Sequence, residues 1–252
     1  MYAPDRHSII LRTLADSGRV TIAELTLRLG VSEMTVRRDL DVLAQEGLLR
    51  RIHGGAAPTG SSSFEPPFSI RSRANTKAKQ KIASAVADSI SDGETVLLDG
   101  GSTGLEVAES LTLRELTVCT LSLRAANVLS TASGITLLIP GGFVRKGELS
   151  FVGPPIIETL KDYRFDVFVV TTSGISASAG LTEWNVDDAA VKRAGLEVSG
   201  RNVVACDASK FGQIAFARVC NLDQIDLIFS DDSLDQSQRT SIAAAGGHLR
   251  IA

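Results

Sequence analysis

The stretch VSEMTVRRDLDVLAQEGLLRRIHGGA, residues 31–56, decides how the first part of the chain folds. Apolar side chains recur at helical spacing in its first half, at Val36, Leu40 and Leu43. Ser32 is suited to cap a helix over 33–45, which Gly47 then ends. The second half, 48–56, is strand-like and contains a Gly-Gly turn, so we expect a β-hairpin directly after the helix.

Two more helices are expected before this stretch. The first covers 5–16 and is stopped by Gly18, and its apolar stripe consists of Ile10, Leu11 and Leu14. Thr21 and Glu24 form a capping box for the second helix, whose apolar face consists of Ile22, Leu25 and Leu29. Gly30 then makes a tight turn into the third helix. Three helices followed by a hairpin predict a winged helix-turn-helix, in which the third helix enters the major groove of DNA.

The face of the third helix that cannot be buried is cationic. Arg38 and Met34 lie opposite its apolar stripe, and Thr35 and Arg37 flank it. Arginine can pair with two acceptors on guanine or with a phosphate, and threonine can contact either. Three further basic side chains belong to the expected wing: Arg50, Arg51 and His53. The spacing alone also fits the solvated face of an ordinary three-helix domain.

The distribution of charge supports the DNA-binding interpretation better than the net charge does. The chain has 252 residues and a formal net charge of −3. Residues 1–57 contain eight arginines and seven acids, and four of these arginines form the pairs Arg37-Arg38 and Arg50-Arg51. The rest of the chain has a net charge of −4. The two arginine pairs are therefore the informative feature.

Several classes of protein are disfavoured by the composition. No run of about 18 apolar residues is present, so we expect no membrane span. The first eight residues lack the apolar core of a signal peptide, which predicts a cytoplasmic protein. Neither a CxxC motif nor a histidine cluster suggests a metal site, and no cofactor is implied. Cys119, Cys206 and Cys220 are expected to be reduced and mostly buried.

A linker divides the chain into two parts. Residues 58–69 are rich in proline, serine and glycine, so we predict a DNA-binding domain over 1–57 and a second domain over 70–252. A long helix is expected over 71–90. Apolar strands then alternate with helices: strands near 95–99, 116–120, 135–139, 166–171, 202–207 and 226–231, and helices near 104–111, 122–131, 155–161, 187–199 and 237–245. This alternation predicts an α/β fold with a mainly parallel sheet and helices on both faces.

The first part closely resembles the DNA-binding segment of DeoR-family bacterial regulators. The residues that carry the resemblance agree in order and spacing: Val31, Ser32, Thr35, Arg37, Arg38, Asp39, Leu40, Leu43, Gly47, His53, Gly54, Gly55 and Ala56. The resemblance implies a winged helix-turn-helix whose recognition helix carries the Ser, Thr and Arg-Arg cluster. The predicted DNA-binding residues are Ser32, Thr35, Arg37, Arg38, Arg50, Arg51 and His53. Met34 departs from the family pattern, and we expect it to tune the choice of operator.

The second part resembles the sugar-phosphate sensor domain of the same family, which is similar to the folds of ribose-5-phosphate isomerases and CoA-transferases. The features that carry this resemblance are 99–103 (DGGST), Gly141-Gly142, 180–182 (GLT), Lys192 and 207–212 (DASKFG). A phosphate site is also favoured by the residues themselves. The glycine-rich loop 100–104 follows a strand and precedes a helix, so it can present backbone N–H groups to an anion.

The effector site is expected beyond the carboxyl ends of the strands. Its predicted residues are Asp99, Gly101, Ser102, Thr103, Thr120, Ser122, Gly142, Lys192 and Lys210. Two positions depart from the family pattern. Leu121 stands where the family often has asparagine, and Ser173 stands where it often has aspartate. These departures put the usual effector in doubt.

Three functions remain open at this point. The first is a repressor, acting as a dimer or tetramer on operator DNA and released by a phosphorylated sugar. The second is a DNA-binding regulator with a degenerate effector pocket, controlled by a protein partner or by its abundance. The third is a sugar-phosphate isomerase, which needs a base such as Asp99, Glu106 or Asp207. The loss of an acid at Ser173 argues against catalysis.

Overall fold

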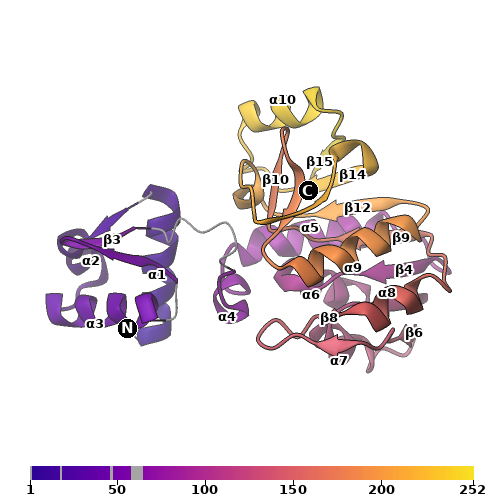
Figure 1. Cartoon of the computed structure of the whole chain (residues 1–252), viewed down its shortest axis with the longest axis horizontal. Helices are drawn as coiled ribbons and strands as arrows, with labels where there is room; N and C mark the ends of the chain where they lie inside the picture. Colours follow the sequence, from indigo (N-terminus) through magenta and orange to yellow (C-terminus); the bar gives the residue numbers. More distant parts are fainter. Residues whose placement is uncertain (1, 18, 46–47, 58–64) are drawn as a thin grey trace. The chain divides into compact units, whose positions relative to one another are not determined.

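The structure is a computed structural model that describes residues 2–17, 19–45, 48–57 and 65–252. The chain divides into two compact units, Met1–Ala74 and Asn75–Ala252, and each is described by itself. Gly18, Gly47 and linker residues 58–64 lie outside the described residues, so the predictions made for them are not addressed. The separate parts are drawn in Figure 1.

The first unit has the predicted order of three helices and a wing. Its elements are α1 (Ala3–Ser17), β1 (Val20–Thr21), α2 (Ile22–Leu29), α3 (Glu33–Gln45), β2 (Arg50–Ile52), β3 (Gly55–Ala57) and the short α4 (Phe68–Arg71). The strands form an antiparallel sheet in the order β1-β3-β2. The sequence did not predict β1, because two residues are too few to establish a strand period. The predicted winged helix-turn-helix is therefore confirmed.

Apolar faces and helix caps hold this unit together. The three helical stripes meet in one core with Val20, Leu48, Leu49 and Ala56. The predicted capping box is present, since the Thr21 hydroxyl accepts from the Glu24 N–H at 3.2 Å and the Glu24 carboxylate accepts from the Thr21 N–H at 2.9 Å. Gly30 ends α2 in the left-handed conformation, with φ 63°, which a residue with a side chain rarely adopts.

The second unit is built on a seven-stranded parallel sheet. Its strand order is β15-β14-β12-β9-β4-β5-β6, and the bounds are β4 (Thr95–Leu98), β5 (Leu116–Thr120), β6 (Ile135–Leu138), β9 (Val167–Val170), β12 (Asn202–Ala205), β14 (Leu227–Ser230) and β15 (Leu249–Ile251). Six of these strands were predicted, so the α/β fold class is confirmed. The short strand β15 was missed at the end of the chain.

Helices cover both faces of this sheet and create two cores (Figure 1). One face packs on α5 (Thr76–Asp88), α6 (Gly101–Leu111) and α7 (Leu123–Leu129). The other packs on α8 (Pro154–Leu160), α9 (Val186–Glu197) and α10 (Gln236–Ala244). Neighbouring strand residues belong to opposite cores, as with Leu97 and Leu98 in β4. A sheet buried on both faces explains why its strands are continuous apolar runs.

Two helix predictions need correction. The expected helix over 71–90 is interrupted, because Asn75 has φ 55° and α5 begins only at Thr76. Asparagine tolerates this left-handed conformation better than most residues. The helix after β4 begins at Gly101 and not near Gly104, so most of the predicted loop 100–104 is the first turn of α6.

Smaller antiparallel elements flank the main sheet. A second sheet has the order β10-β11-β13, formed by β10 (Gly174–Ser176), β11 (Gly180–Glu183) and β13 (Ala217–Cys220). A hairpin consists of β7 (Phe143–Val144) and β8 (Phe151–Val152). None of these strands was predicted from the sequence. All three cysteines are free and buried, and burial raises the pKa of the Cys119 thiol to about 12.

Candidate functional site

The candidate DNA-binding surface begins with the capped start of α3. The Ser32 hydroxyl accepts from the Thr35 N–H at 3.3 Å, and the two hydroxyl oxygens lie 3.0 Å apart. Ser32 therefore helps to hold the helix end in place, in addition to its predicted contact with DNA. Met34 is 75% exposed on the first turn. The start of α3 thus presents an uncovered side chain where a recognition helix meets bases.

The two arginines of α3 differ in their partners. Arg37 lies 3.6 Å from Glu33 one turn earlier, and both side chains are at least half exposed. Arg38 is exposed, and among the described residues it has no ion pair or hydrogen bond. An exposed ion pair of this kind contributes about 0–1 kcal/mol, so Arg37 can exchange its partner at low cost. Both guanidiniums are therefore available to a polyanion.

The wing carries the other predicted contacts. Arg50 and His53 are exposed on it. Arg51 has a structural role, because its Nε lies 3.0 Å from Asp41 Oδ1 and its Nη1 donates to the Gly55 carbonyl at 3.1 Å. These contacts tie β2 to α3 and to β3. The predicted DNA-binding residues thus lie in one small unit, and Arg51 also stabilises the wing of that unit.

A buried ion pair behind α3 was missed in the sequence. Asp39 is 4% exposed, and its carboxylate accepts from Arg6 Nε at 2.6 Å and from Arg6 Nη2 at 2.9 Å. His7 Nε2 lies 3.1 Å from the same carboxylate. Burial opposes ionisation of Asp39, but the hydrogen bonds from Arg6 and His7 outweigh it and lower its pKa. The available signal was that Asp39 lies beside Leu40 and one turn from Val36, on the buried side of α3.

The candidate effector site lies at the carboxyl ends of β4 and β9. The chain leaves β4 toward β5 and later returns to its other side with β9, so this is the switch point where α/β sheets bind ligands. Asp99 follows β4, and its carboxylate accepts from the Gly100 N–H at 2.7 Å and from the Thr171 N–H at 2.9 Å. Asp99 therefore fixes the two loops next to each other.

Lys192 of α9 is buried in the middle of this site. Its Nζ lies 3.0 Å from Asp99 Oδ2, donates to the Thr171 carbonyl at 2.8 Å and pairs with Glu183. We call Asp99, Thr171, Glu183 and Lys192 the Lys192 cluster. Burial disfavours the charged lysine, but the two carboxylates outweigh it and raise the pKa of Lys192. Lys192 is accordingly charged in the folded protein.

The first turn of α6 and the end of β5 contribute the predicted hydroxyls. Ser102 and Thr103 are buried on α6. Thr120 Oγ1 donates to the Leu98 carbonyl at 3.2 Å, and the Ser122 hydroxyl caps α7 by accepting from the Ala125 N–H at 3.4 Å. Thr120 and Ser122 are thus engaged with backbone groups.

The departures from the family pattern have structural consequences. Leu121 belongs to the apolar core beside α8 and α9. The Ser173 hydroxyl donates to the Glu183 carboxylate, which also accepts from the Trp184 N–H at 2.9 Å. Glu183 thus places an acid beside Ser173 from the neighbouring strand β11. The sequence analysis missed Glu183 because β11 was not predicted.

Lys210 and Gly142 lie outside the Lys192 cluster. Lys210 follows β12, and its Nζ lies 4.8 Å from the centre of the Trp184 ring. Asp207 caps the short 3₁₀ turn Ala208–Lys210 and accepts from Asn75 Nδ2 at 2.9 Å. Gly142 has φ 97° and lies against Val152 and Ile156, where it supports the β7–β8 hairpin.

The hairpin brings a second charged group that the sequence analysis missed. Arg145 lies between β7 and β8, and its Nη2 is 2.7 Å from Asp188 Oδ2. Ser150 donates to Asp188 Oδ1 at 2.7 Å, and Arg145 Nε donates to Ser150 Oγ at 3.3 Å. We call Arg145, Ser150 and Asp188 the Arg145 cluster. Asp188 is one turn before Lys192 on α9, so one helix supplies both clusters.

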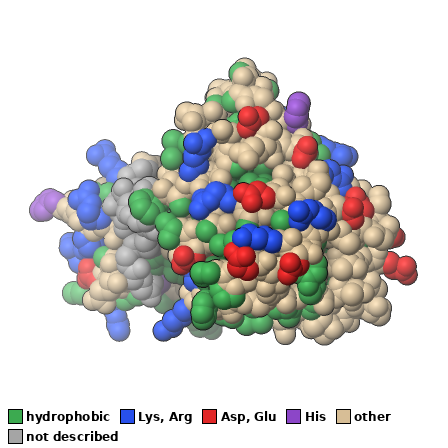
Figure 2. All heavy atoms as spheres, turned by 45° about the vertical axis from the view of Figure 1, so that its right-hand side comes forward, with side chains coloured by type: hydrophobic (Ala, Val, Ile, Leu, Met, Phe, Trp, Pro, Cys, Tyr) green, Lys and Arg blue, Asp and Glu red, His purple; other side chains and the backbone are tan. Residues whose placement is uncertain are grey.

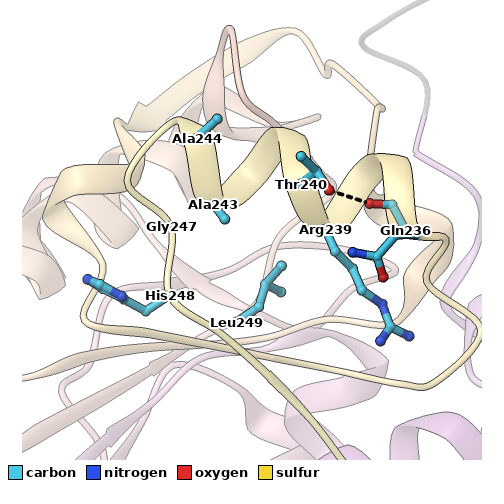
Figure 3. A pocket seen from close by; sticks show the side chains of 8 residues that line it. All are labelled: Gln236, Arg239, Thr240, Ala243, Ala244, Gly247, His248 and Leu249. Carbon is cyan, nitrogen blue, oxygen red and sulfur yellow. Dashed lines mark hydrogen bonds between the residues drawn. The ribbon is translucent and has the colours of Figure 1, made fainter.

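A shallow groove between α10 and the start of β15 contains none of the predicted residues (Figure 3). Its polar side chains are bound locally: Thr240 donates to the Gln236 carbonyl at 2.9 Å, and Arg239 donates to the Leu234 carbonyl at 2.8 Å. On the face of the larger unit in Figure 2, basic and acidic side chains alternate. That face is therefore not a basic patch of the kind that binds DNA.

Comparison with known proteins identifies both units. Residues 6–61 match the family model described as the DeoR-like helix-turn-helix domain, and residues 74–232 match that of the DeoR C terminal sensor domain. The chain belongs to the DeoR family of transcriptional regulators. The resemblance stated from the sequence is thereby confirmed for both parts of this DeoR-family regulator.

Named relatives cover nearly the whole chain. The glycerol-3-phosphate regulon repressor of Escherichia coli K12 is 32% identical over 92% of each chain. The putative aga operon transcriptional repressor of E. coli O157:H7 is 31% identical over 96% of this regulator and 91% of the relative. The solved structure of ribose 5-phosphate isomerase A from Methanocaldococcus jannaschii is 15% identical and covers 56% of each chain with a TM-score of 0.42.

Within the described residues no helix is both long and apolar enough to span a bilayer. The same part of the chain contains no group of three or more histidine, cysteine, aspartate or glutamate residues placed to hold a metal ion.

Proposed function

We propose that this DeoR-family regulator represses genes of carbohydrate metabolism in the cytoplasm and leaves its operator when a phosphorylated sugar binds the sensor domain. The observation that carries the DNA half is the exposed, cationic face of α3 around Arg38. In our proposal α3 lies in the major groove, with Arg37 and Arg38 toward the bases. Arg50 and His53 of the wing follow the phosphate backbone.

Repression requires at least two copies of the chain. A single recognition helix reads only a few base pairs, and a symmetric pair reads two half-sites about one helical turn apart. We therefore propose a homodimer or a tetramer bound to an inverted repeat. The named relatives support repression as the direction of control, because both are called repressors.

The effector half of the proposal rests on the polar site at the end of β4. The first turn of α6 offers backbone N–H groups together with Ser102 and Thr103, and a phosphate is favoured at such a helix start. Lys210 adds a cation beside Trp184. The carboxylates of the Lys192 cluster are suited to accept hydrogen bonds from sugar hydroxyls. One of the relatives is named for a phosphorylated polyol, glycerol 3-phosphate.

A second candidate is a regulator of the same kind without a small-molecule effector. It is favoured by the burial of Leu121 in the apolar core and by the closed ion pairs around Lys192. An isomerase activity is disfavoured, because Asp99 and Asp207 are occupied in holding loop backbones. We propose no catalytic residue.

The decisive experiment measures DNA release and ligand binding on the same preparation. An operator is first selected from random DNA, and its affinity is then measured with each member of a panel of phosphorylated sugars and polyols. Trp184 is the only tryptophan in the chain, so its fluorescence reports binding at the sensor. At about 100 times its Kd, a ligand stabilises the protein by about 2.7 kcal/mol and raises Tm.

Each outcome distinguishes the candidates. A compound that raises Tm and weakens operator binding establishes the sensor. A panel without any shift, on protein that still binds its operator, favours the second candidate. Turnover of a sugar phosphate by the pure protein would reinstate the enzyme.

A further inference from the structure

The β7–β8 hairpin lies against the proposed effector site. The hairpin is joined to the end of β5 by backbone pairing between Ser122 and Ser150 and by a hydrogen bond from the Phe151 N–H to the Leu121 carbonyl at 2.9 Å. Ser150 also lies next to Gly100, since a Cβ added to that glycine would be 3.8 Å from the Ser150 Cβ. The inner end of the hairpin is therefore a wall of the proposed effector site.

The charges already at this site constrain how an anion can be bound. Lys192 is 5% exposed and shared between Asp99 and Glu183. A phosphate placed on Lys192 would face both carboxylates at short range. Arg145 is different, because its side chain is 19% exposed and it pairs with Asp188 at the start of α9. Of these two cations, Arg145 is the one that an incoming anion can reach.

We propose that Arg145 is an effector-binding residue that exchanges Asp188 for the anionic group of the effector. This role rests on the proposed sugar-phosphate effector, and it assigns Arg145 as the residue that binds the phosphate group of that effector. Guanidinium can bind phosphate through two parallel hydrogen bonds, whereas here its Nη2 lies 2.7 Å from Asp188 Oδ2 and its Nε donates to Ser150 Oγ at 3.3 Å. Ser150 keeps its hydrogen bond to Asp188 when Arg145 leaves, so the Asp188 carboxylate still has a hydrogen-bond donor.

The state of Asp188 makes the exchange feasible. Burial raises the pKa of Asp188 to about 6, although Arg145, Ser150 and Lys192 act in the opposite direction and Glu183 adds to the rise. When Arg145 moves to the phosphate, this carboxyl can take up a proton more easily than an ordinary aspartate. The cost of leaving a buried carboxylate without its cation is thereby reduced.

The exchange also connects the site to the hairpin. Arg145 lies between the two strands of the hairpin, while Asp188 and Lys192 lie one turn apart on α9. Moving the guanidinium toward Gly100 loosens the hairpin from α9 and leaves the Lys192 cluster intact. Effector binding is therefore expected to increase amide exchange in β7 and at the start of α9, relative to α6.

The test compares three variants of the full chain with the wild type. They are Arg145→Gln, Asp188→Asn and the control Arg124→Gln. Arg124 also holds the hairpin, by donating to the carbonyls of Gly147 and Glu148. The probes are inorganic phosphate, glycerol 3-phosphate and glucose 6-phosphate, with glucose as the uncharged comparison. Binding is measured by Trp184 fluorescence and by the shift in Tm.

The signs of the effects separate a binding role from a structural one. We expect Arg145→Gln to weaken phosphate-ester binding by about 10- to 100-fold, as for the loss of a hydrogen bond to a charged group. Asp188→Asn should tighten it several-fold, because the competing carboxylate is gone, and Arg124→Gln should leave it unchanged. If Arg145→Gln proves too unstable, Arg145→Lys keeps the positive charge but lacks the paired N–H donors of guanidinium. We expect it to give an intermediate loss of affinity for phosphate esters.

Two results would overturn the role of Arg145 while leaving the effector in place. One is equal affinity of the wild type and Arg145→Gln for the phosphorylated probes. The other is an equal loss of affinity in Arg145→Gln and Asp188→Asn, which would mean that the Arg145 cluster has only a structural role. If the wild type binds none of the phosphorylated probes, the proposed effector fails, and the role of Arg145 fails with it.

Discussion

The two candidate sites of this regulator place their positive charges in opposite ways. In the DNA-binding unit Arg38 and Arg50 are exposed, and neither has a carboxylate partner among the described residues. In the sensor unit Lys192 is buried between Asp99 and Glu183. The first arrangement accepts a polyanion without rearrangement, whereas the second requires an anion to compete with carboxylates that are already present. This difference suits a constant DNA surface and an effector site that changes when it is filled.

In each unit a buried charged group nevertheless holds neighbouring elements together. Asp39 holds α1 on α3 through Arg6, and Lys192 holds the ends of β4, β9 and β11 together. The desolvation of such groups is costly, so their partners must be present in the right geometry. The four predictions below test the contrast between buried and exposed charges, from the largest expected effect to the smallest.

The largest effect is expected for Lys192→Met. Removing the cation leaves Asp99 and Glu183 buried and uncompensated, which costs about 3–5 kcal/mol of unfolding free energy. Urea unfolding followed by Trp184 fluorescence measures this in the sensor unit. Lys161→Met is the matched control, because its ion pair with Glu158 is exposed and contributes about 0–1 kcal/mol. Similar losses in the two variants would refute the special role of Lys192.

The next effect concerns Asp39→Asn and its dependence on pH. We expect a loss of about 1.5–3 kcal/mol at pH 7, since the hydrogen bonds from Arg6 lose their charged acceptor. The folded pKa of Asp39 is lowered, so its contribution is full above the unfolded pKa of about 3.9 and declines as pH falls through the folded value.

Amide exchange of α1 and α3 in the full chain measures this contribution. The stability difference between the wild type and Asp39→Asn should narrow toward low pH. A difference that stays constant from pH 7 to strongly acidic conditions would show that the charge of Asp39 is not what stabilises the helix pair.

A smaller effect is expected on DNA binding by Arg38→Ala. If Arg38 contacts a base, its loss costs about 1–3 kcal/mol and relaxes specificity at one position of the operator. Fluorescence anisotropy with the selected operator and with single-base variants measures both quantities. Equal weakening on every sequence would mean that Arg38 contacts only phosphate.

The smallest effect is expected for Arg50→Ala, which should lower the slope of log K against log salt by about 0.9 with little loss of specificity. Arg51→Ala is the informative comparison. Arg51 is tied to Asp41 and Gly55, so its removal should also destabilise the wing. An unchanged salt slope in Arg50→Ala would refute its assignment to the DNA backbone.

The elements predicted well from the sequence are those that local pattern specifies. Helix α3 has the predicted bounds of Glu33 and Gln45, because capping by Ser32 and the spacing of its apolar residues are local properties. The six predicted strands of the main sheet are buried on both faces, so each is a run of apolar residues. The strands β10, β11 and β13 were missed, since they are short and their pairing joins distant segments.

The predicted site shows the same division. From the sequence alone we predicted Asp99, Ser102, Thr103 and Lys192 as effector-site residues, on a family resemblance and a glycine-rich loop, and we predicted the exposed arginines of α3 from helical periodicity. Only the tertiary structure decided which charges are paired. Ser150 and Asp188 are 38 residues apart and Arg6 and Asp39 are 33 apart, and both pairs depend on how separate elements pack. The interaction energy of a charged side chain depends on its partners and its burial, and both are decided by how the chain folds.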